Sequence, residues 1–233
     1  MRTTDHSRPP QFYGGGLNVL DPKDRLGIKS EYITRLQELA LRTHLPAADG
    51  LAVDVGCGYG RLSGFLAREG WKVIGIDPAY DLVKYAQRHQ PNAAFCVGAL
   101  PKLPVPAGTA RLVLFQNLLR PLLQLDNLIA VKGSGDLVAQ GGHLALVDNI
   151  WPGNPEFVEE EWIRQTFDRE GFYLVKRVPI RAGRWWMLYP IRYGLVSRAW
   201  LPKIAEYELR LRSGMSGRER WRYTNVLFLF QRR

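Results

Sequence analysis

The chain has 233 residues, of which 46% are hydrophobic and 11% aromatic, so it can bury a core and is not disordered throughout. No apolar stretch approaches the roughly 18–20 residues of a membrane span, and the polar start of the chain lacks the apolar region of a secretory signal. The two cysteines, Cys57 and Cys96, form no Cys-X-X-Cys pair, which argues against a disulfide scaffold and a cysteine-rich zinc site. We expect a cytoplasmic protein without a membrane-spanning segment or a metal site.

The formal net charge of +10 lies entirely in the last quarter of the chain. Residues 1–176 hold 19 basic and 19 acidic side chains, whereas residues 177–233 hold 13 basic and 3 acidic ones. This asymmetry predicts that the C-terminal part meets an acidic or polyanionic partner.

Strands and helices alternate through the first two thirds of the chain. After a flexible arm over residues 1–16, helical spacing runs from residue 24 to about residue 44. Short apolar strands are predicted over residues 51–56, 71–77, 93–98, 111–115 and 141–149. Helices are predicted between them over residues 61–69, 79–89 and 125–140. This alternation is typical of parallel βαβ units, so we predict an α/β, doubly wound sheet.

The regular alternation of strands and helices ends after Pro152. A helix is predicted over residues 156–171, and strands over residues 172–180 and 224–232. The 43 residues between these strands are too many for a hairpin turn and should carry their own structure. We therefore divide the chain into three parts: an N-terminal arm and helical cap (1–48), a core (49–180 and 224–233) and an insertion (181–223).

A glycine-rich segment, VDVGCGYG, follows the first predicted strand, where an open parallel sheet binds its ligands. Arg61 stands where a dinucleotide fingerprint needs its third glycine, and the lysine of a phosphate-binding P-loop is absent. Asp54 suits an ammonium group better than a pyrophosphate, and Asp77, at the end of the second strand, can accept ribose hydroxyls. These residues suit a ligand with a ribose, a cationic amino-acid end and no phosphate, and S-adenosylmethionine fits that description.

Residues 51–149 resemble the class I S-adenosylmethionine-dependent methyltransferase family. The resemblance rests on VDVGCGYG, on GIDP at residues 75–78, and on the segment from Val97 to Arg111. It implies an enzyme with a Rossmann-like, seven-stranded sheet: five parallel strands and an antiparallel terminal pair. It also implies S-adenosyl-L-methionine as cofactor, with S-adenosyl-L-homocysteine as product, and a helical cap before the sheet.

The resemblance also implies roles for individual residues around the cofactor. Those expected to hold its methionine end are Asp54, Gly56, Cys57, Gly58 and Gly60, with Phe115 and Gln116 beside them. Asp77 would hold the ribose, Pro78 would pack near the adenine, and the backbone of Leu100 would contact the adenine edge. Ala99 stands where the family has an adenine-binding aspartate, so one acceptor for the adenine amine is missing.

Methyl transfer from a sulfonium mainly requires alignment of the nucleophile and exclusion of water, and the sequence assigns no catalytic base. Polar candidates at the rim of the site, each at or after the end of a predicted strand, are Asn117, Arg120, Asp148 and Asn149. The insertion holds 10 basic and 8 aromatic residues. As a substrate lid, it would offer apolar walls from Trp185, Trp186 and Tyr189, with Arg181, Arg184 and Arg192 holding an anionic group.

Three alternatives to a lid remain open for the insertion: a nucleic-acid surface, an element at a membrane interface, and an ordinary helical layer. We expect methyl transfer to an O or N atom of a small-molecule acceptor that is anionic or aromatic. The alternatives are an RNA methyltransferase that uses the basic C-terminal quarter and a non-catalytic S-adenosylmethionine-binding module. The sequence specifies neither the acceptor's identity nor the oligomeric state.

Overall fold

The computed structural model describes residue 24 and residues 26–118, 133–183, 185–213 and 223–233. The predicted N-terminal arm and two of the arginines named above, Arg120 and Arg184, lie outside the described residues.

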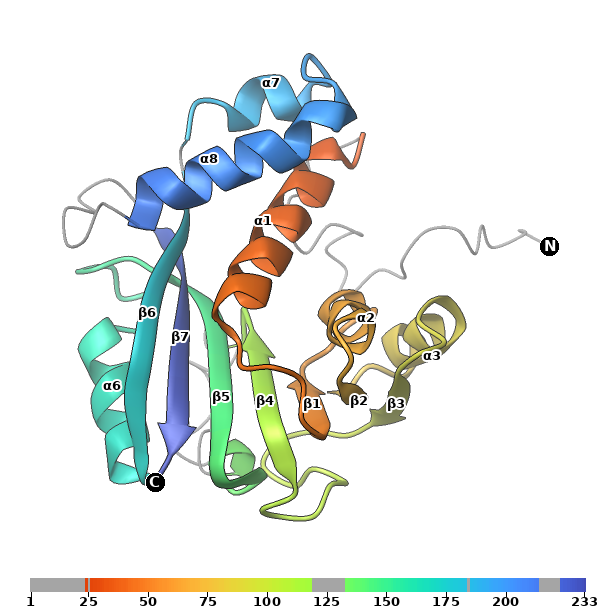
Figure 1. Ribbon diagram of the computed structural model, residues 1–233, viewed down its shortest axis with the longest axis vertical. Helices are drawn as coiled ribbons and strands as arrows, with labels where there is room; N and C mark the ends of the chain where they lie inside the picture. The colour runs from red at the N-terminus through yellow and green to blue at the C-terminus, as the bar shows by residue number, and fades with distance from the viewer. Residues whose placement is uncertain (1–23, 25, 119–132, 184, 214–222) are drawn as a thin grey trace.

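The described chain forms one seven-stranded sheet with the strand order β3-β2-β1-β4-β5-β7-β6 (Figure 1). The strands are β1 (Leu51–Val55), β2 (Lys72–Asp77), β3 (Ala94–Val97), β4 (Ala110–Gln116), β5 (Val138–Ile150), β6 (Phe172–Ala182) and β7 (Thr224–Arg232). Strands β1 to β5 pair in parallel, and β7 runs antiparallel to both β5 and β6. The predicted five parallel strands and antiparallel terminal pair are confirmed.

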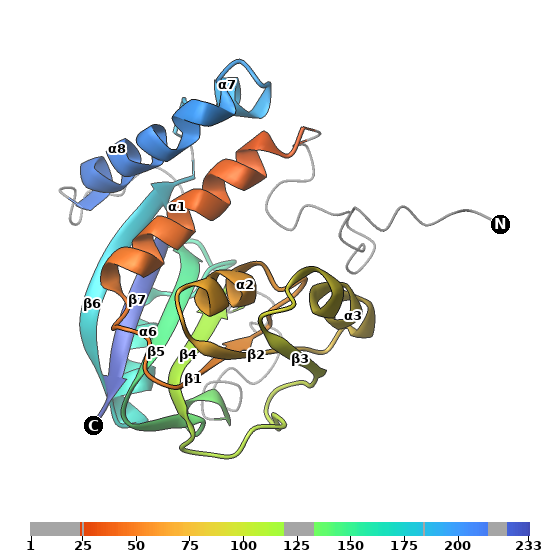
Figure 2. The same ribbon diagram turned by 45° about the vertical axis from the view of Figure 1, so that its right-hand side comes forward.

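Helices cover both faces of the sheet, as the doubly wound arrangement requires. The helices are α1 (Ile28–His44), α2 (Arg61–Arg68), α3 (Tyr80–His89), α6 (Glu160–Arg169), α7 (Leu188–Arg192), the 3-10 turn η1 (Arg198–Trp200) and α8 (Leu201–Ser213). One core cluster joins the sheet to α1, α2, α7 and α8, and a second joins its opposite face to α6. Figure 2 shows α1 and α2 together on one side of the sheet.

Three predicted helices differ from the structure by more than one residue at an end. The first is predicted from residue 24, whereas α1 begins at Ile28. The helix predicted over residues 125–140 fails at its end, because Val138 pairs with Ala110 and residues 138–140 belong to β5. The residues from 125 to 132 lie outside the described chain. Helix α6 begins at Glu160, not at residue 156, because the Asn154 side chain accepts a hydrogen bond from the N–H of Glu156 and holds a turn there.

The connection from β6 to β7 contains α7, η1 and α8. Helix α8 packs against α1 and β6, and α7 packs against α1. In Figure 1, α7 and α8 lie together at the top of the molecule. Among the residues that the structure describes, no helix combines the length and the apolar character needed to cross a bilayer.

Candidate functional site

The glycine loop between β1 and α2 has a backbone that other residues rarely adopt. Gly56, Gly58 and Gly60 have φ angles of 72°, 55° and 79°, all in the left-handed region. A Cβ on Gly60 would lie 2.8 Å from the ring of Phe95, so this position also lacks room for a side chain. The N–H groups of Gly56 and Cys57 both donate to the carbonyl of Ile76, at 2.8 and 3.0 Å, and tie the loop to β2.

Asp77 lies at the end of β2 and fixes the middle of the loop. One carboxylate oxygen accepts a hydrogen bond from the N–H of Gly58 at 2.9 Å, and the other accepts one from the N–H of Ala79 at 2.9 Å. Burial raises the pKa of Asp77, and these two N–H groups oppose that rise. The residue that follows β3 also contacts Asp77, since the N–H of Gly98 donates to the backbone carbonyl of Asp77 at 3.2 Å.

Asp54 is buried in β1, two residues before Gly56 of the loop. Its carboxylate accepts a hydrogen bond of 2.6 Å from the hydroxyl of Ser63 on α2. Burial raises the pKa of Asp54 to about 6. Cys57 is also buried, and burial raises the pKa of its thiol well above the usual range, so it packs as a neutral side chain beside Val83 and Phe95.

The loop and its acids fit S-adenosylmethionine. A Cβ on Gly58 would meet no atom within 4 Å, so open space lies beside the loop at the residue that Asp77 anchors. The two acids nearest this space, Asp54 and Asp77, would repel a pyrophosphate but suit a ribose diol and an ammonium group. A sulfonium cofactor without phosphates is compatible with both carboxylates.

The carboxyl ends of the strands carry a buried polar network that extends away from the loop. Its centre is Gln37 on α1, whose side-chain oxygen accepts hydrogen bonds from Arg61 at 2.9 Å and from Gln116 at 2.8 Å. The Gln37 side-chain nitrogen donates to Asn225 at 3.1 Å, and Asn225 donates to Asn149 at 3.0 Å. This polar network therefore connects the first residue of α2 to β4, β5 and β7.

Arg181 lies beside the polar network on β6, where it is the register partner of Asn225. It is 6% exposed, and its Nε and Nη1 atoms have no hydrogen-bond partner among the described residues. Its guanidinium lies 5.5 Å from the centre of the Tyr223 ring. Close by, the hydroxyl of Tyr32 donates to Glu208 at 2.6 Å.

Asn117, directly after β4, adopts a φ of 50°, which is uncommon for a residue other than glycine. Its N–H donates to the carbonyl of Val147 at 2.8 Å, and its side-chain oxygen is buried without a partner in the described part of the chain. A backbone fixed in an uncommon conformation and a buried acceptor without a hydrogen bond, both at this edge of the sheet, are typical of a binding site.

The structure places the predicted site residues in two separate regions. Around the loop and the ends of β2 and β4 it brings together Asp54, Gly56, Cys57, Gly58, Gly60, Asp77, Pro78, Phe115, Gln116 and Asn117. Ala99 and Leu100 follow Gly98 beside Asp77. The aromatic residues of the insertion are elsewhere: Trp185 is buried in the core against Tyr32, with ring centres 6.2 Å apart, and Trp186 and Tyr189 are 66% and 57% exposed.

Three residues of the polar network, Gln37, Arg61 and Asn225, were not among the residues predicted for the site. Gln37 reads as an ordinary polar position on an amphipathic helix, and its partner Asn225 is 188 residues away in the chain. Only the packing of α1 over the strand ends brings the two together. No local signal in the sequence could have shown this contact.

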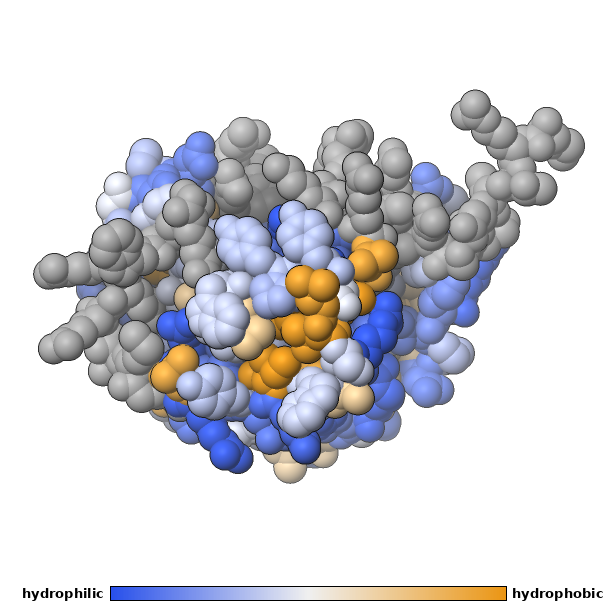
Figure 3. Space-filling view, turned by 90° about the horizontal axis from the view of Figure 1, so that it is seen from above, coloured by the Kyte–Doolittle hydropathy of each residue, from blue (hydrophilic) through white to orange (hydrophobic). Residues whose placement is uncertain are grey.

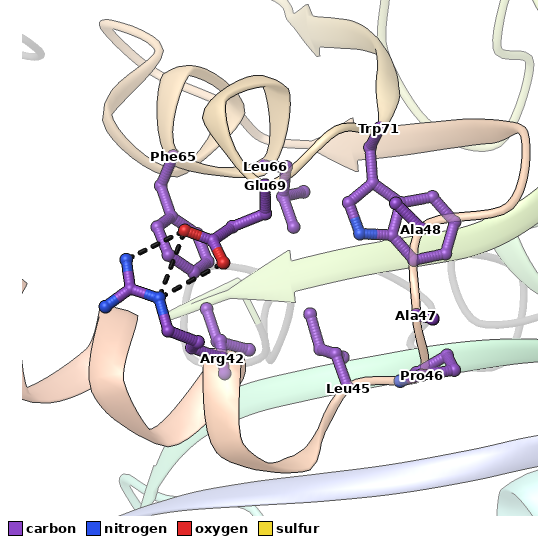
Figure 4. A pocket seen from close by; sticks show the side chains of 10 residues that line it. Arg42, Leu45, Pro46, Ala47, Ala48, Phe65, Leu66, Glu69 and Trp71 are labelled. Atoms are coloured by element: carbon purple, nitrogen blue, oxygen red, sulfur yellow. Dashed lines mark hydrogen bonds and ion pairs between the residues drawn. The ribbon is translucent and has the colours of Figure 1, made fainter.

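A distinct pocket of about 300 Å³ lies at the opposite edge of the sheet (Figure 4). It is lined by the segment that precedes β1 and by Trp71, which precedes β2, and the ion pair of Arg42 with Glu69 at 2.8 Å crosses it. Ligands of open α/β sheets bind at the carboxyl ends of the strands, so this pocket is not the candidate site.

Comparison with known proteins gives matches to a protein family and to curated methyltransferases. Residues 52–142 match the protein family described as "Methyltransferase domain". The chain is 34% identical over 102 residues to trans-aconitate 2-methyltransferase of Afipia carboxidovorans, which is 42% of this chain and 38% of that protein. It is 51% identical over 55 residues to ubiquinone biosynthesis O-methyltransferase of Xanthomonas campestris pv. campestris, which is 24% of this chain and 22% of that protein. The matched segments thus span well under half of either curated relative.

Solved structures share the fold at low sequence identity. Geranyl diphosphate C-methyltransferase from Streptomyces coelicolor has a TM-score of 0.65 and 16% identity, with 92% of this chain and 85% of that chain covered. The [4+2]-cyclase SpnF has a TM-score of 0.63 and 15% identity, with 85% of this chain and 80% of that chain covered.

The strand order, the glycine loop and Asp77 define a class I methyltransferase fold. Within it, residues 52–142 match the methyltransferase-domain family.

Proposed function

We propose that this chain transfers a methyl group from S-adenosylmethionine to an O or N atom of a small-molecule acceptor. The observation that carries the proposal is the glycine loop held by Asp77 beside open space at Gly58. The cofactor, when bound, supplies an electrophilic methyl group on a good neutral leaving group. Because a protein of the same fold is named as a cyclase, the activity needs its own test.

In this proposal the residues of the chain bind, orient and exclude water. Asp77 would accept the ribose hydroxyls, and the loop backbone with Asp54 would hold the methionine end. Pro78, Ala99 and Leu100 would border the adenine. Phe115 and Gln116 would lie on the methionine side. Asn117, whose backbone has a positive φ and whose side-chain oxygen has no partner among the described residues, would face the acceptor and align its nucleophilic atom.

Arg181 supports an acceptor that carries an anionic group. The charge of the buried Arg181 acts on the carboxylate of Glu208, but its Nε and Nη1 atoms have no hydrogen-bond partner among the described residues, and buried donors without partners are costly. A carboxylate of the acceptor would accept a hydrogen bond from this guanidinium. One curated relative is named for trans-aconitate, which is a carboxylate.

The proposed division of the chain gives each part a role. The core would hold the cofactor, and the N-terminal cap would cover it through α1, which already contributes Gln37 and Tyr32. The inner side of the insertion, where Trp185 packs on Tyr32 and α8 on β6, would close the acceptor side beside Arg181.

The first experiment is a calorimetric titration of the purified protein with S-adenosylhomocysteine, with NAD as the control. We expect saturable binding of the first ligand alone. Methyl transfer is then measured with labelled S-adenosylmethionine, a panel of carboxylic acids and their neutral amides. Failure to bind S-adenosylhomocysteine would overturn the proposal, and binding without transfer to any acceptor would favour a non-catalytic module.

The anionic acceptor is tested with Arg181→Met. This variant should lose transfer to carboxylic acids and keep its affinity for S-adenosylhomocysteine. Arg177→Met is the matched control, because Arg177 lies on the same strand but is paired with Glu160 at 2.9 Å. Transfer to RNA that weakens steeply with salt would instead support the nucleic-acid alternative.

A further inference from the structure

Large hydrophobic side chains are exposed mainly on one part of the surface. Of the twelve that are exposed in the described chain, seven lie between Trp186 and Leu211, on α7, η1, α8 and the turns between them. Seen from above, pale aromatic and orange aliphatic side chains form a continuous group there, bordered by blue hydrophilic ones (Figure 3). We call this surface, from Trp186 to Leu211, the outer aromatic face. A concentration of this kind marks an interaction site, unlike single exposed hydrophobic residues.

Helix α8 explains why these side chains point outward, because it is apolar on two sides. Its inner side buries Leu201 and Leu209 against α1 and β6. On its outer side, Tyr207 and Leu211 lie four residues apart on one helical face and are 61% and 40% exposed, and Trp200, which ends η1 directly before α8, is 57% exposed. The inner side of α8 packs against α1 and β6, whereas its outer side has no partner among the described residues.

The outer side is also hollowed. A groove of about 360 Å³ runs between the start of the insertion and α8, and Trp186, Met187, Trp200 and Tyr207 are among its lining residues. One charged residue, Lys203, lines it, and the ammonium group of this lysine lies 5.0 Å from the centre of the Trp200 ring. The groove is therefore apolar with a cationic border.

The charge of this region restricts the partner to an anionic one. Residues 177–233 carry the whole excess of +10, and α8 itself exposes two basic residues, Lys203 and Arg210, against one acidic residue, Glu206. A second copy of the chain would bring the same positive charge and be repelled. A nucleic acid could use the arginines and the aromatic rings but not Leu195, which is 79% exposed, or Leu211.

We propose that the outer aromatic face docks on the surface of a bilayer that contains anionic lipids. Tryptophan and tyrosine are the side chains best suited to the boundary between headgroups and acyl chains, because one end of each is apolar and the other polar. Leu195 and Leu211 enter the acyl region, and Lys203 and Arg210 meet the anionic headgroups. Helix α8 lies flat on the membrane, and the chain binds peripherally.

The test is co-sedimentation of the full chain with phosphatidylcholine vesicles, with and without phosphatidylglycerol. We expect binding to the anionic vesicles that weakens with salt, and a blue shift of tryptophan emission. The double variant Trp200→Ser, Tyr207→Ser should bind about tenfold more weakly, since it removes two anchors. Tyr80→Ser is the matched control, because Tyr80 is 63% exposed on α3 and outside the face.

A second variant, Lys203→Glu, changes charge without removing apolar surface and should weaken binding to anionic vesicles alone. Each variant is checked by S-adenosylhomocysteine titration, so that loss of fold or of cofactor binding is seen separately from loss of docking. Equal sedimentation of the wild type and the double variant would overturn the proposal. A concentration-dependent dimer that the double variant abolishes, or tighter binding to an RNA oligonucleotide than to vesicles, would also overturn it.

Discussion

Asp77 and Gly58 are joined by a hydrogen bond of 2.9 Å, in which the backbone N–H of the glycine donates to the carboxylate. The acid expected to bind the ribose therefore also holds the loop expected to bind the methionine end. The two halves of the cofactor site are coupled through one side chain, and a change in Asp77 should disturb both.

Replacing Asp77 by asparagine should weaken S-adenosylhomocysteine binding by about 10- to 100-fold, as expected for the loss of a charged hydrogen-bond partner. The amide cannot accept from both Gly58 and Ala79, because one of its two ends is a donor. Calorimetric titration measures the effect. Asp81→Asn is the control, since Asp81 is exposed on α3. Similar losses in both variants would contradict a specific role for Asp77.

Gly60→Ala should destabilise the fold by about 2–4 kcal/mol, from a strained φ together with an overpacked neighbour. The new Cβ would lie 2.8 Å from the Phe95 ring and 3.0 Å from Ala86. Gly153→Ala is the matched control, because Gly153 has a φ of 75° and open space around it. Urea denaturation separates the two effects, because the control variant is destabilised only by the strained backbone conformation and not by a steric contact. Equal free energies of unfolding in the two variants would show that the contact with Phe95 carries no cost.

The sequence predicted those parts of the fold that rest on local patterns. Alternating apolar strands and helices specify the parallel sheet, and three glycines after a strand specify the loop, because both depend on residues close together in the chain. The helix predicted over residues 125–140 failed where Val138 joins the sheet, since pairing with Ala110 outweighs local helical spacing.

The remaining features depend on contacts between distant residues. Adjacent tryptophans in the insertion have the same local character, yet Trp185 is 8% exposed and Trp186 66%, because only one of them faces Tyr32 on α1. Likewise, Gln37 enters the site through a helix that precedes the sheet. Local spacing predicts a helix at such positions but not which side chain the tertiary packing will bury.

Gln37→Leu should lower the free energy of unfolding by about 2–4 kcal/mol, because it leaves Arg61, Gln116 and Asn225 without their shared buried partner. Gln165→Leu is the control, since Gln165 is exposed and bonds only to Glu161 on the same helix among the contacts of the described chain. Denaturant unfolding measures both variants. A Gln37 variant as stable as the control would mean that the network contributes little.

The pH dependence of stability should report on Asp54. Burial raises its pKa from 3.8 to about 6 in the folded protein. Between about pH 4 and pH 6 the folded state therefore binds more protons than the unfolded chain, so this group makes the free energy of unfolding fall as the pH rises. The loss is complete above about pH 7 and amounts to about 2–3 kcal/mol.

Asp54→Asn removes this titration and keeps an acceptor for the hydroxyl of Ser63. The variant should therefore match the wild type near pH 4 and exceed its stability at pH 7, as measured by urea unfolding at a series of pH values. Asp81→Asn, on the exposed side of α3, should leave the pH profile unchanged. Parallel profiles for Asp54→Asn and the wild type would contradict the raised pKa. A gain in stability at pH 7 together with weaker S-adenosylhomocysteine binding would show that the fold keeps a costly buried charge because the ligand needs it.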